Sequence, residues 1–266
     1  LNCCNNSMLL EMSMDYITSL LFLCPIMFLA SFVDAISGGG GLLSLPAYLF
    51  TGMPVHNAYA CNKLCCNIST AMSAGRDLKN NLIDKKAAFF VGAVTFCCSV
   101  LASKIVLWMP DRALSLMLLG SMPFVAILIL VNKKYPKEDH SDEVTGNRKI
   151  GLWIFTGIAM GAYDGMLGPG SGTLAIIIYT KLLKYDLTRA SGNAKVAVFS
   201  STLAGTISYL LAGKILWNYA LPVAICGVLG GYAGSGMAIR KGARFIRPMM
   251  LVIAAVLIVK LIFEML

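Results

Sequence analysis

Charged residues are scarce in this sequence. Asp, Glu, Lys and Arg together make up only 13% of its 266 residues, which is about half of their share in soluble globular domains. Hydrophobic residues make up 58%, and runs with almost no charge approach the ~20 residues that a membrane-spanning helix needs. This composition excludes an ordinary soluble domain and predicts an all-α polytopic membrane protein whose helices lie in the lipid bilayer.

The common catalytic and nucleotide-binding patterns are also missing. The chain has two histidines and contains no Gly-x-Ser-x-Gly, no Cys-x-x-Cys and no Walker-type phosphate loop. Most of its nine cysteines lie in apolar runs, where Cys behaves as a small hydrophobe. Cys61 and Cys65 share a helix face, but their counterparts in the second half are not thiols. We expect no enzymatic activity, no metal and no cofactor; an intramembrane enzyme or assembly factor that uses the cysteines is a rival hypothesis.

The formal net charge of +9 raises the question of a nucleic-acid partner. In a chain with many spanning segments, an excess of Lys and Arg is typical of loops that stay on the cytoplasmic side, so we expect no nucleic acid. Residues 1–15 contain no Lys or Arg. We therefore do not expect a cleaved signal sequence.

The apolar runs predict ten helical segments. Their expected bounds are 15–37, 42–52, 54–76, 86–107, 112–131, 150–168, 172–184, 188–212, 217–238 and 244–265. The one long polar stretch, 132–149, predicts a linker. We therefore divide the chain into an N-terminal membrane repeat (1–131), the linker (132–149) and a C-terminal membrane repeat (150–266).

The two halves repeat the same pattern. Asp34 closes an apolar run just before the glycines 38–41, and Asp164 does so before Gly168-Pro169-Gly170-Ser171-Gly172. Further along, Ala58-x4-Lys63 matches Ala190-x4-Lys195. Interrupted hydrophobic segments at corresponding places of two halves are the best sequence indicator of a transporter's binding site.

The basic residues indicate how the repeats lie in the membrane. With Lys63 and Lys195 set aside, one side collects the Lys and Arg of 76–86, 133–149, 181–189 and 240–247, and the other receives Lys104, Arg112, Lys214 and Lys260. The first side is then cytoplasmic. Because the basic loops follow different segments in the two halves, we predict inverted repeats, a cytoplasmic linker and both termini outside. Charge leaves open whether 15–37 and 42–52 both cross or form a re-entrant hairpin.

The glycine breaks are the first candidate binding elements. Four glycines in a row destabilise a helix, and Pro169 removes a backbone donor as well. If new helices begin near Gly41 and Gly172, their free N–H groups and positive dipole ends face the breaks and favour an anion. We therefore include Gly40, Gly41, Gly170 and Gly172 as substrate-binding candidates. The alternative is close helix packing by small residues.

Lys63 and Lys195 are the second candidates. Each lies about 12–15 Å inside its segment, at 1.5 Å per residue, and an ionisable residue at such depth marks a functional site by default. We expect both lysines to bind the substrate or to act in ion coupling. The alternative is a structural ion pair with Asp34 or Asp164, and a mixed case pairs each lysine with Asp in one state and with substrate in another.

Smaller polar residues complete the candidate site. Asp34 and Asp164 are predicted either to couple transport to protons or another ion, or to cap the broken helices. Asn62, Ser69 and Ser201 lie on the same segments as the lysines. We name them as substrate contacts, and hydrogen bonding between helices is the alternative.

These motifs resemble those of the TauE/SafE sulfite exporter family, also called the toluene sulfonate uptake permease group. The resemblance rests on Asp34 with its glycines and Pro46, on Asn62-Lys63, and on the echo from Asp164 to Lys195; it covers about 16–265 and includes the turn Gly213-Lys214-Ile215. It implies transport of small sulfur-containing anions such as sulfite or an organosulfonate. It also implies a bacterial or archaeal cytoplasmic membrane.

The sequence thus predicts a secondary transporter, in the direction of export, for a small anion that crosses by alternating access. The alternatives are a permease for a cation or another small solute, and an anion channel of the same architecture. Proton or ion coupling and homo-oligomer formation are left open.

Overall fold

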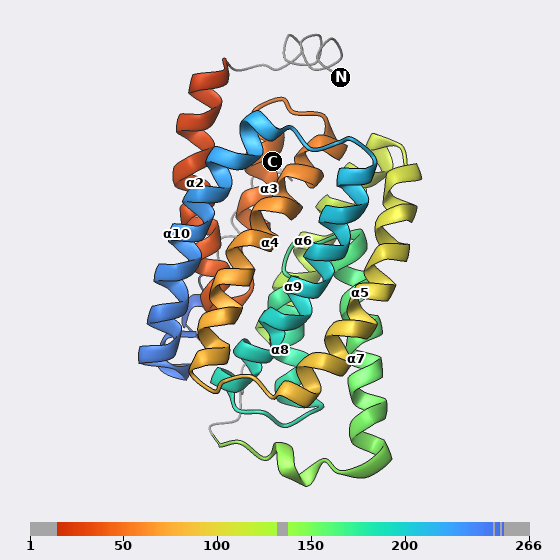
Figure 1. Ribbon diagram of the computed structural model, residues 1–266, viewed down its shortest axis with the longest axis vertical. Helices are drawn as coiled ribbons and strands as arrows, with labels where there is room; N and C mark the ends of the chain where they lie inside the picture. The colour runs from red at the N-terminus through yellow and green to blue at the C-terminus, as the bar shows by residue number, and fades with distance from the viewer. Residues whose placement is uncertain (1–14, 132–137, 247, 251, 253–266) are drawn as a thin grey trace.

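The computed structural model describes residues 15–131, 138–246, 248–250 and 252, and this part of the chain is helical apart from its loops (Figure 1). The helices are α2 (Tyr16–Ser37), α3 (Gly41–Phe50), α4 (Val55–Lys79), α5 (Lys85–Trp108), α6 (Asp111–Val131), α7 (Gly146–Met166), α8 (Ser171–Lys181), α9 (Leu187–Leu211) and α10 (Trp217–Lys241), with one short turn η1 (Ser141–Glu143).

The observed helices match the predicted segments within a few residues. The largest difference is at α7, which begins at Gly146 and takes in the end of the predicted linker. Most of the predicted segment 244–265 lies outside the described residues, as do 1–14. In the described part, four helices are long and apolar enough to cross a membrane, namely α2, α5, α9 and α10. The all-helical class predicted from the sequence is therefore confirmed for the described residues, and the four apolar helices are consistent with a membrane protein.

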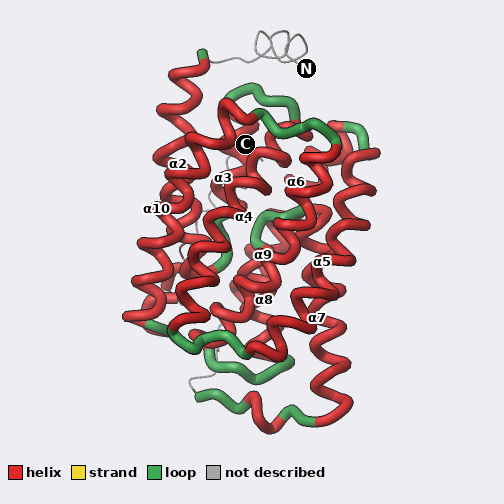
Figure 2. Tube along the Cα trace, viewed as in Figure 1, coloured by secondary structure: helices red, strands yellow, loops and turns green. Residues whose placement is uncertain are grey.

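Two short helices distinguish this bundle from a simple set of crossings. α3 has 10 residues and α8 has 11, so each is about 15 Å long and too short to cross a bilayer. The loop after α3 lies at the end of the bundle where α2 begins, and α8 likewise returns toward the end where α7 begins (Figure 1). The breaks before α3 and α8 form loop segments inside the bundle, away from both ends (Figure 2).

Small residues join helices from different halves of the sequence. A Cβ at Gly230 or Gly234 of α10 would lie 2.1 or 2.3 Å from backbone carbonyl oxygens of α2. Gly157, Gly161 and Gly165 of α7 meet α5 in the same way, with side-chain carbons 2.6–2.7 Å from the added Cβ. Spacing of small residues by four lets helices approach closely in membranes, so two tight seams, α2–α10 and α5–α7, build the bundle.

Asp84 closes the turn between α4 and α5 at one end of the bundle. Its Oδ1 accepts the N–H groups of Lys86 and Ala87, and its Oδ2 accepts the hydroxyl of Tyr185 at 2.7 Å. Burial raises the pKa of this carboxyl, but the hydrogen bonds from Tyr185 and the two N–H groups outweigh it, so the pKa lies below its usual value. The ionised form therefore stabilises this end of the fold.

We expect the protein to become less stable as the pH is lowered through the acidic range, because Asp84 loses its charge there. A carboxyl whose pKa is depressed by folding contributes stability above its unfolded pKa, about 3.9, and loses this contribution as pH falls through the folded value. Asp84→Asn should flatten that part of the stability profile, measured by thermal unfolding in detergent between pH 7 and pH 3. Asp142→Asn, at an exposed position, is the matched control, and an equal flattening there would contradict the assignment.

Candidate functional site

The two glycine breaks touch each other in the middle of the bundle. Gly38 has φ +75°, and a Cβ there would lie 2.2 Å from the carbonyl carbon of Gly172. The reverse approach is equally tight, since a Cβ at Gly172 would lie 2.5 Å from the Cα of Gly38. Glycine is required on both sides, because no other residue lets the end of α2 and the start of α8 meet at this distance.

The helices after the breaks begin at Gly41 and Ser171, within one residue of the predicted segment starts at 42 and 172. Their N–H groups are nevertheless partly bonded within the protein. Thr173 donates its N–H to the carbonyl of Gly38 at 3.2 Å and its hydroxyl to the carbonyl of Ser37 at 2.9 Å. The first turn of α8 thus serves to hold the end of α2, and this reduces the number of donors that face a ligand.

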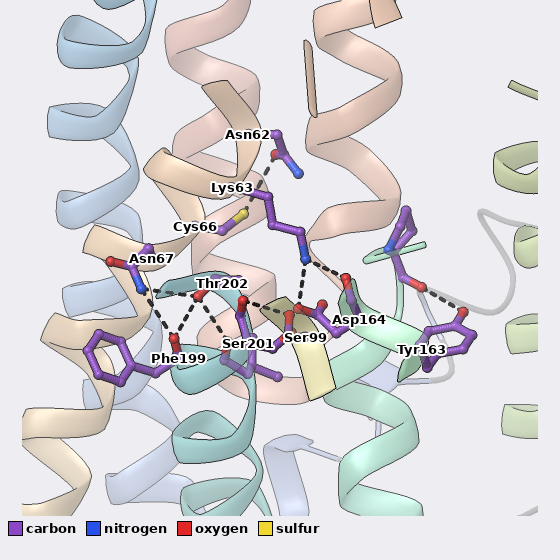
Figure 3. Close-up of polar contacts among 12 residues, drawn as sticks. Asn62, Lys63, Cys66, Asn67, Ser99, Tyr163, Asp164, Phe199, Ser201 and Thr202 are labelled. Carbon is purple, nitrogen blue, oxygen red and sulfur yellow. Dashed lines mark hydrogen bonds and ion pairs between the residues drawn. The ribbon is translucent and has the colours of Figure 1, made fainter. Parts of the chain in front are cut away.

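Lys63 and Asp164 form an ion pair at the second break (Figure 3). The ammonium nitrogen lies 2.7 Å from Oδ2 of Asp164 and also donates to the backbone carbonyl of the same residue. The side chains are only 4% and 3% exposed. The alternative in which Lys63 pairs with an aspartate of the break is therefore confirmed in this state of the molecule.

Neighbouring glycines allow Lys63 to reach across the bundle from α4. A Cβ at Gly205 of α9 would lie 3.2 Å from Cδ of Lys63, and a Cβ at Gly168 would lie 3.6 Å from its ammonium nitrogen. The aliphatic stem therefore lies along α9 while the charge reaches the second break. The lysine of one half of the sequence meets the glycine break of the other half.

A cavity opens beside this ion pair, and we call it the Lys63 cavity. Its volume is about 20 Å³, which is enough for a water molecule. Its polar lining comes from both breaks and both lysine-bearing helices: Asp34, Gly41, Asn62, Lys63, Asp164, Gly168, Ser171 and Thr202. Several candidates separated in sequence thus surround one space.

Lys195 has a partner, Asp77, that the sequence pattern does not predict. Its ammonium nitrogen lies 2.5 Å from Oδ2 of Asp77, and the side chains are 7% and 2% exposed. The alternative that pairs Lys195 with Asp34 or Asp164 is therefore not found in the described conformation. Asp77 was missed because it lies at the end of α4 beside Arg76, where an acid looks like an ordinary helix-end residue; its counterpart in the second half is Tyr209.

The side chain of Asp34 accepts one hydrogen bond and forms no ion pair within the described chain. Its Oδ1 accepts the N–H of Gly40 at 3.0 Å, so the capping role predicted for this residue is present. Asp34 also lines a second cavity, together with Gly38, Thr70, Gly172, Ser191 and Lys195, which we call the Lys195 cavity.

The remaining candidates divide between the cavities and the helix interfaces. Asn62 lines the Lys63 cavity. Ser69 donates to the carbonyl of Gly227 at 2.9 Å, and the hydroxyl of Ser201 lies 2.8 Å from that of Ser99 (Figure 3). Both serines thus join helices. Gly170 packs against α6, since a Cβ there would lie 2.7 Å from Val125.

Two of the seven cysteines in the described part of the chain are buried between helices. The thiol of Cys61 donates to the backbone carbonyl of Leu216, which precedes α10, and the thiol of Cys65 donates to that of Ala220 on α10. Among the described residues, no group of three or more His, Cys, Asp or Glu comes together in a way that would hold a metal ion.

Long apolar helices, broken helices that meet inside the bundle and buried lysines define the class of a polytopic membrane transport protein. The chain belongs to the TauE/SafE sulfite exporter family: the family model described as "Sulfite exporter TauE/SafE" matches residues 23–261. The resemblance proposed from the sequence motifs is therefore confirmed.

Curated relatives agree with this class. The chain is 30% identical over 237 residues to a "Probable membrane transporter protein" of Haemophilus influenzae, which covers 89% of this chain and 92% of the relative. It is also 30% identical over 239 residues to "Probable membrane transporter protein YfcA" of Escherichia coli K12, covering 89% and 87%. A probable membrane transporter protein of Methanocaldococcus jannaschii is 26% identical over 223 residues, covering 77% and 81%. No solved structure matches the chain.

Proposed function

We propose that this protein is a secondary transporter that exports a small anion, sulfite or an organosulfonate, by alternating access. The observation that carries the proposal is the buried Lys63, whose ammonium group reaches the second glycine break and lines a cavity beside the first. A cation held inside an apolar bundle at a helix break is a natural partner for an anionic group. The family description, which names sulfite export, supports the substrate class.

Asp164 occupies the place at Lys63 that we assign to the substrate. An anion that enters the Lys63 cavity has to replace this carboxylate, so the ion pair holds the lysine in the empty state and releases it in the loaded state. This is the mixed role, in which the lysine has two alternative partners. Asn62 and the first residues of α3 and α8 would hydrogen-bond the remaining oxygens of the anion.

We further propose that the halves are inverted repeats with a cytoplasmic linker and both termini outside. The support is the sequence repeat together with the distribution of charge. The ends of α4 and α10 and the start of α7, all with basic residues, lie at one end of the bundle, while the start of α2 and the loop before α10 lie at the other (Figure 1). With the cell interior negative, export of an anion is favoured by ~2.3 kcal/mol per charge and 100 mV.

Binding to the purified protein tests the proposed substrate class. We expect one of sulfite, sulfate, thiosulfate or methanesulfonate to raise the unfolding temperature, because a ligand at 100 times its Kd stabilises the folded state by about 2.7 kcal/mol. The shift should disappear in the double variant Lys63→Met/Asp164→Asn and persist in Lys104→Met, which removes an exposed lysine. Shifts with cations alone would contradict the anion site.

A permease for a cation or another small solute is the second candidate, favoured by the two carboxylates, Asp34 and Asp164, in one cavity. An anion channel would share the same breaks. Counterflow in proteoliposomes separates these classes. An internal pool of unlabelled anion should accelerate entry of the labelled anion in a transporter, whereas a channel shows no such exchange and a cation permease shows no anion flux.

A further inference from the structure

Lys195 faces two carboxylates and is bonded to only one of them. It pairs with Asp77 at the end of α4, while Asp34 of α2 lines the same cavity as Lys195 and has no ion pair in the described chain. Asp34 and Lys195 are the sequence counterparts of Asp164 and Lys63, which are paired. The ion pair is therefore present between Lys63 and Asp164 at the second break, and the equivalent pair between Lys195 and Asp34 at the first break is not formed.

The pair that Lys195 does form is incompletely satisfied. Oδ1 of Asp77 is buried and has no hydrogen-bond partner in the described chain. A buried carboxylate oxygen without a hydrogen bond does not recover the free energy of hydration that it lost on burial. Exchange of Lys195 to another carboxylate is therefore less costly than breakage of a fully bonded pair.

Asp34 is positioned to take up a proton. It lines the Lys63 cavity and the Lys195 cavity, and it also borders a narrow packing gap with Ser31, Gly40, Ser44 and Ser69. The titratable groups that line these spaces with Asp34 are Lys63, Asp164, Tyr59, Cys66 and Lys195. Both lysines among them are bonded to other carboxylates, so a charge on Asp34 lacks a bonded counter-ion in a region where such a charge is costly.

We propose that Asp34 is the proton-coupling group of the transporter and that Lys195 exchanges between Asp77 and Asp34 during the cycle. A proton on Asp34 and a Lys195–Asp34 ion pair exclude each other. In the described state Lys195 stays with Asp77 and Asp34 binds a proton from water; in the other state the proton leaves and Lys195 pairs with Asp34.

This inference rests on the proposed transport function and adds its coupling ion. It also gives Asp77 a role: it holds Lys195 away from Asp34 while the proton is bound. Because proton uptake at Asp34 can be measured without substrate, the coupling step and the substrate class can be tested separately.

Infrared difference spectroscopy of the purified protein in lipid nanodiscs, between acidic and neutral buffer and without substrate, tests the proposal. We expect a protonated-carboxyl band that Asp34→Asn removes and that Asp142→Asn leaves unchanged. In Asp77→Asn, Lys195 is free to pair with Asp34 and favours its ionised form. The midpoint of the band should then move to lower pH by about 1–3 pH units.

A band that survives in Asp34→Asn, or a midpoint in Asp77→Asn that stays in place or rises, would overturn the proposal. Asp77→Asn keeps the test valid even where Asp34→Asn fails to fold. If both spectral results are as expected and no anion is transported, the proposed substrate class fails while the assignment of the proton to Asp34 stands.

Discussion

Replacement of Lys63 by methionine should abolish anion transport and destabilise the protein. Removal of the ammonium group leaves the carboxylate of Asp164 unpaired at 3% exposure, and a broken buried ion pair typically costs about 3–5 kcal/mol. Loss of the anion's partner should lower transport by about 100-fold or more. Uptake of a labelled organosulfonate into proteoliposomes, with protein amounts matched, measures the second effect.

The double variant Lys63→Met/Asp164→Asn separates the two effects. It removes both charges, and replacement of a buried pair by neutral residues is often neutral or stabilising. We therefore expect a well-folded protein that binds no anion. Normal transport by this variant would show that Lys63 serves only the structure.

Replacement of Gly38 by alanine should prevent the two breaks from meeting. The residue would adopt a left-handed conformation that costs about 1–2 kcal/mol, and its Cβ would lie 2.2 Å from the backbone of Gly172. Overpacking of this kind adds about 1–3 kcal/mol. The yield of folded protein and its unfolding temperature in detergent should both fall strongly.

Gly151→Ala is the matched control for Gly38→Ala. Gly151 lies within α7, and a Cβ there meets nothing within 4 Å. Alanine at this position should leave the free energy of unfolding unchanged or raise it by up to about 1 kcal/mol, because alanine favours the helix. Equal losses in both variants would show that the contact between the breaks does not determine stability.

The helices could be predicted from the sequence because each apolar run is bounded by glycine, proline or charge. The start of α3 at Gly41 follows from the glycines before it, and the start of α8 at Ser171 from Pro169 and Gly170. The length of α7 was less predictable, because Gly146–Lys149 are polar and read as linker although they continue the helix.

Residues of the candidate site could be predicted only where the same charged residue type occurs at matching positions of both halves of the sequence. Lys63 and Asp164 recur at matched places and are found in contact. Asp77 has no acidic counterpart, and only the packing of α4 against α9 brings it to Lys195. Ser69 and Ser201 lie on the expected helices, but the way each helix is rotated directs them to the neighbouring helices α10 and α5. Such rotation depends on tertiary packing, which one sequence does not specify.

The seams α2–α10 and α5–α7 have a mechanical consequence. Each joins a helix before the linker to a helix after it, with glycines so close to the facing helix that the partners cannot separate without loss of contact along their length. On the proposed alternating access, the two halves of the sequence would therefore not move as separate rigid bodies. Each moving body would contain helices from both halves.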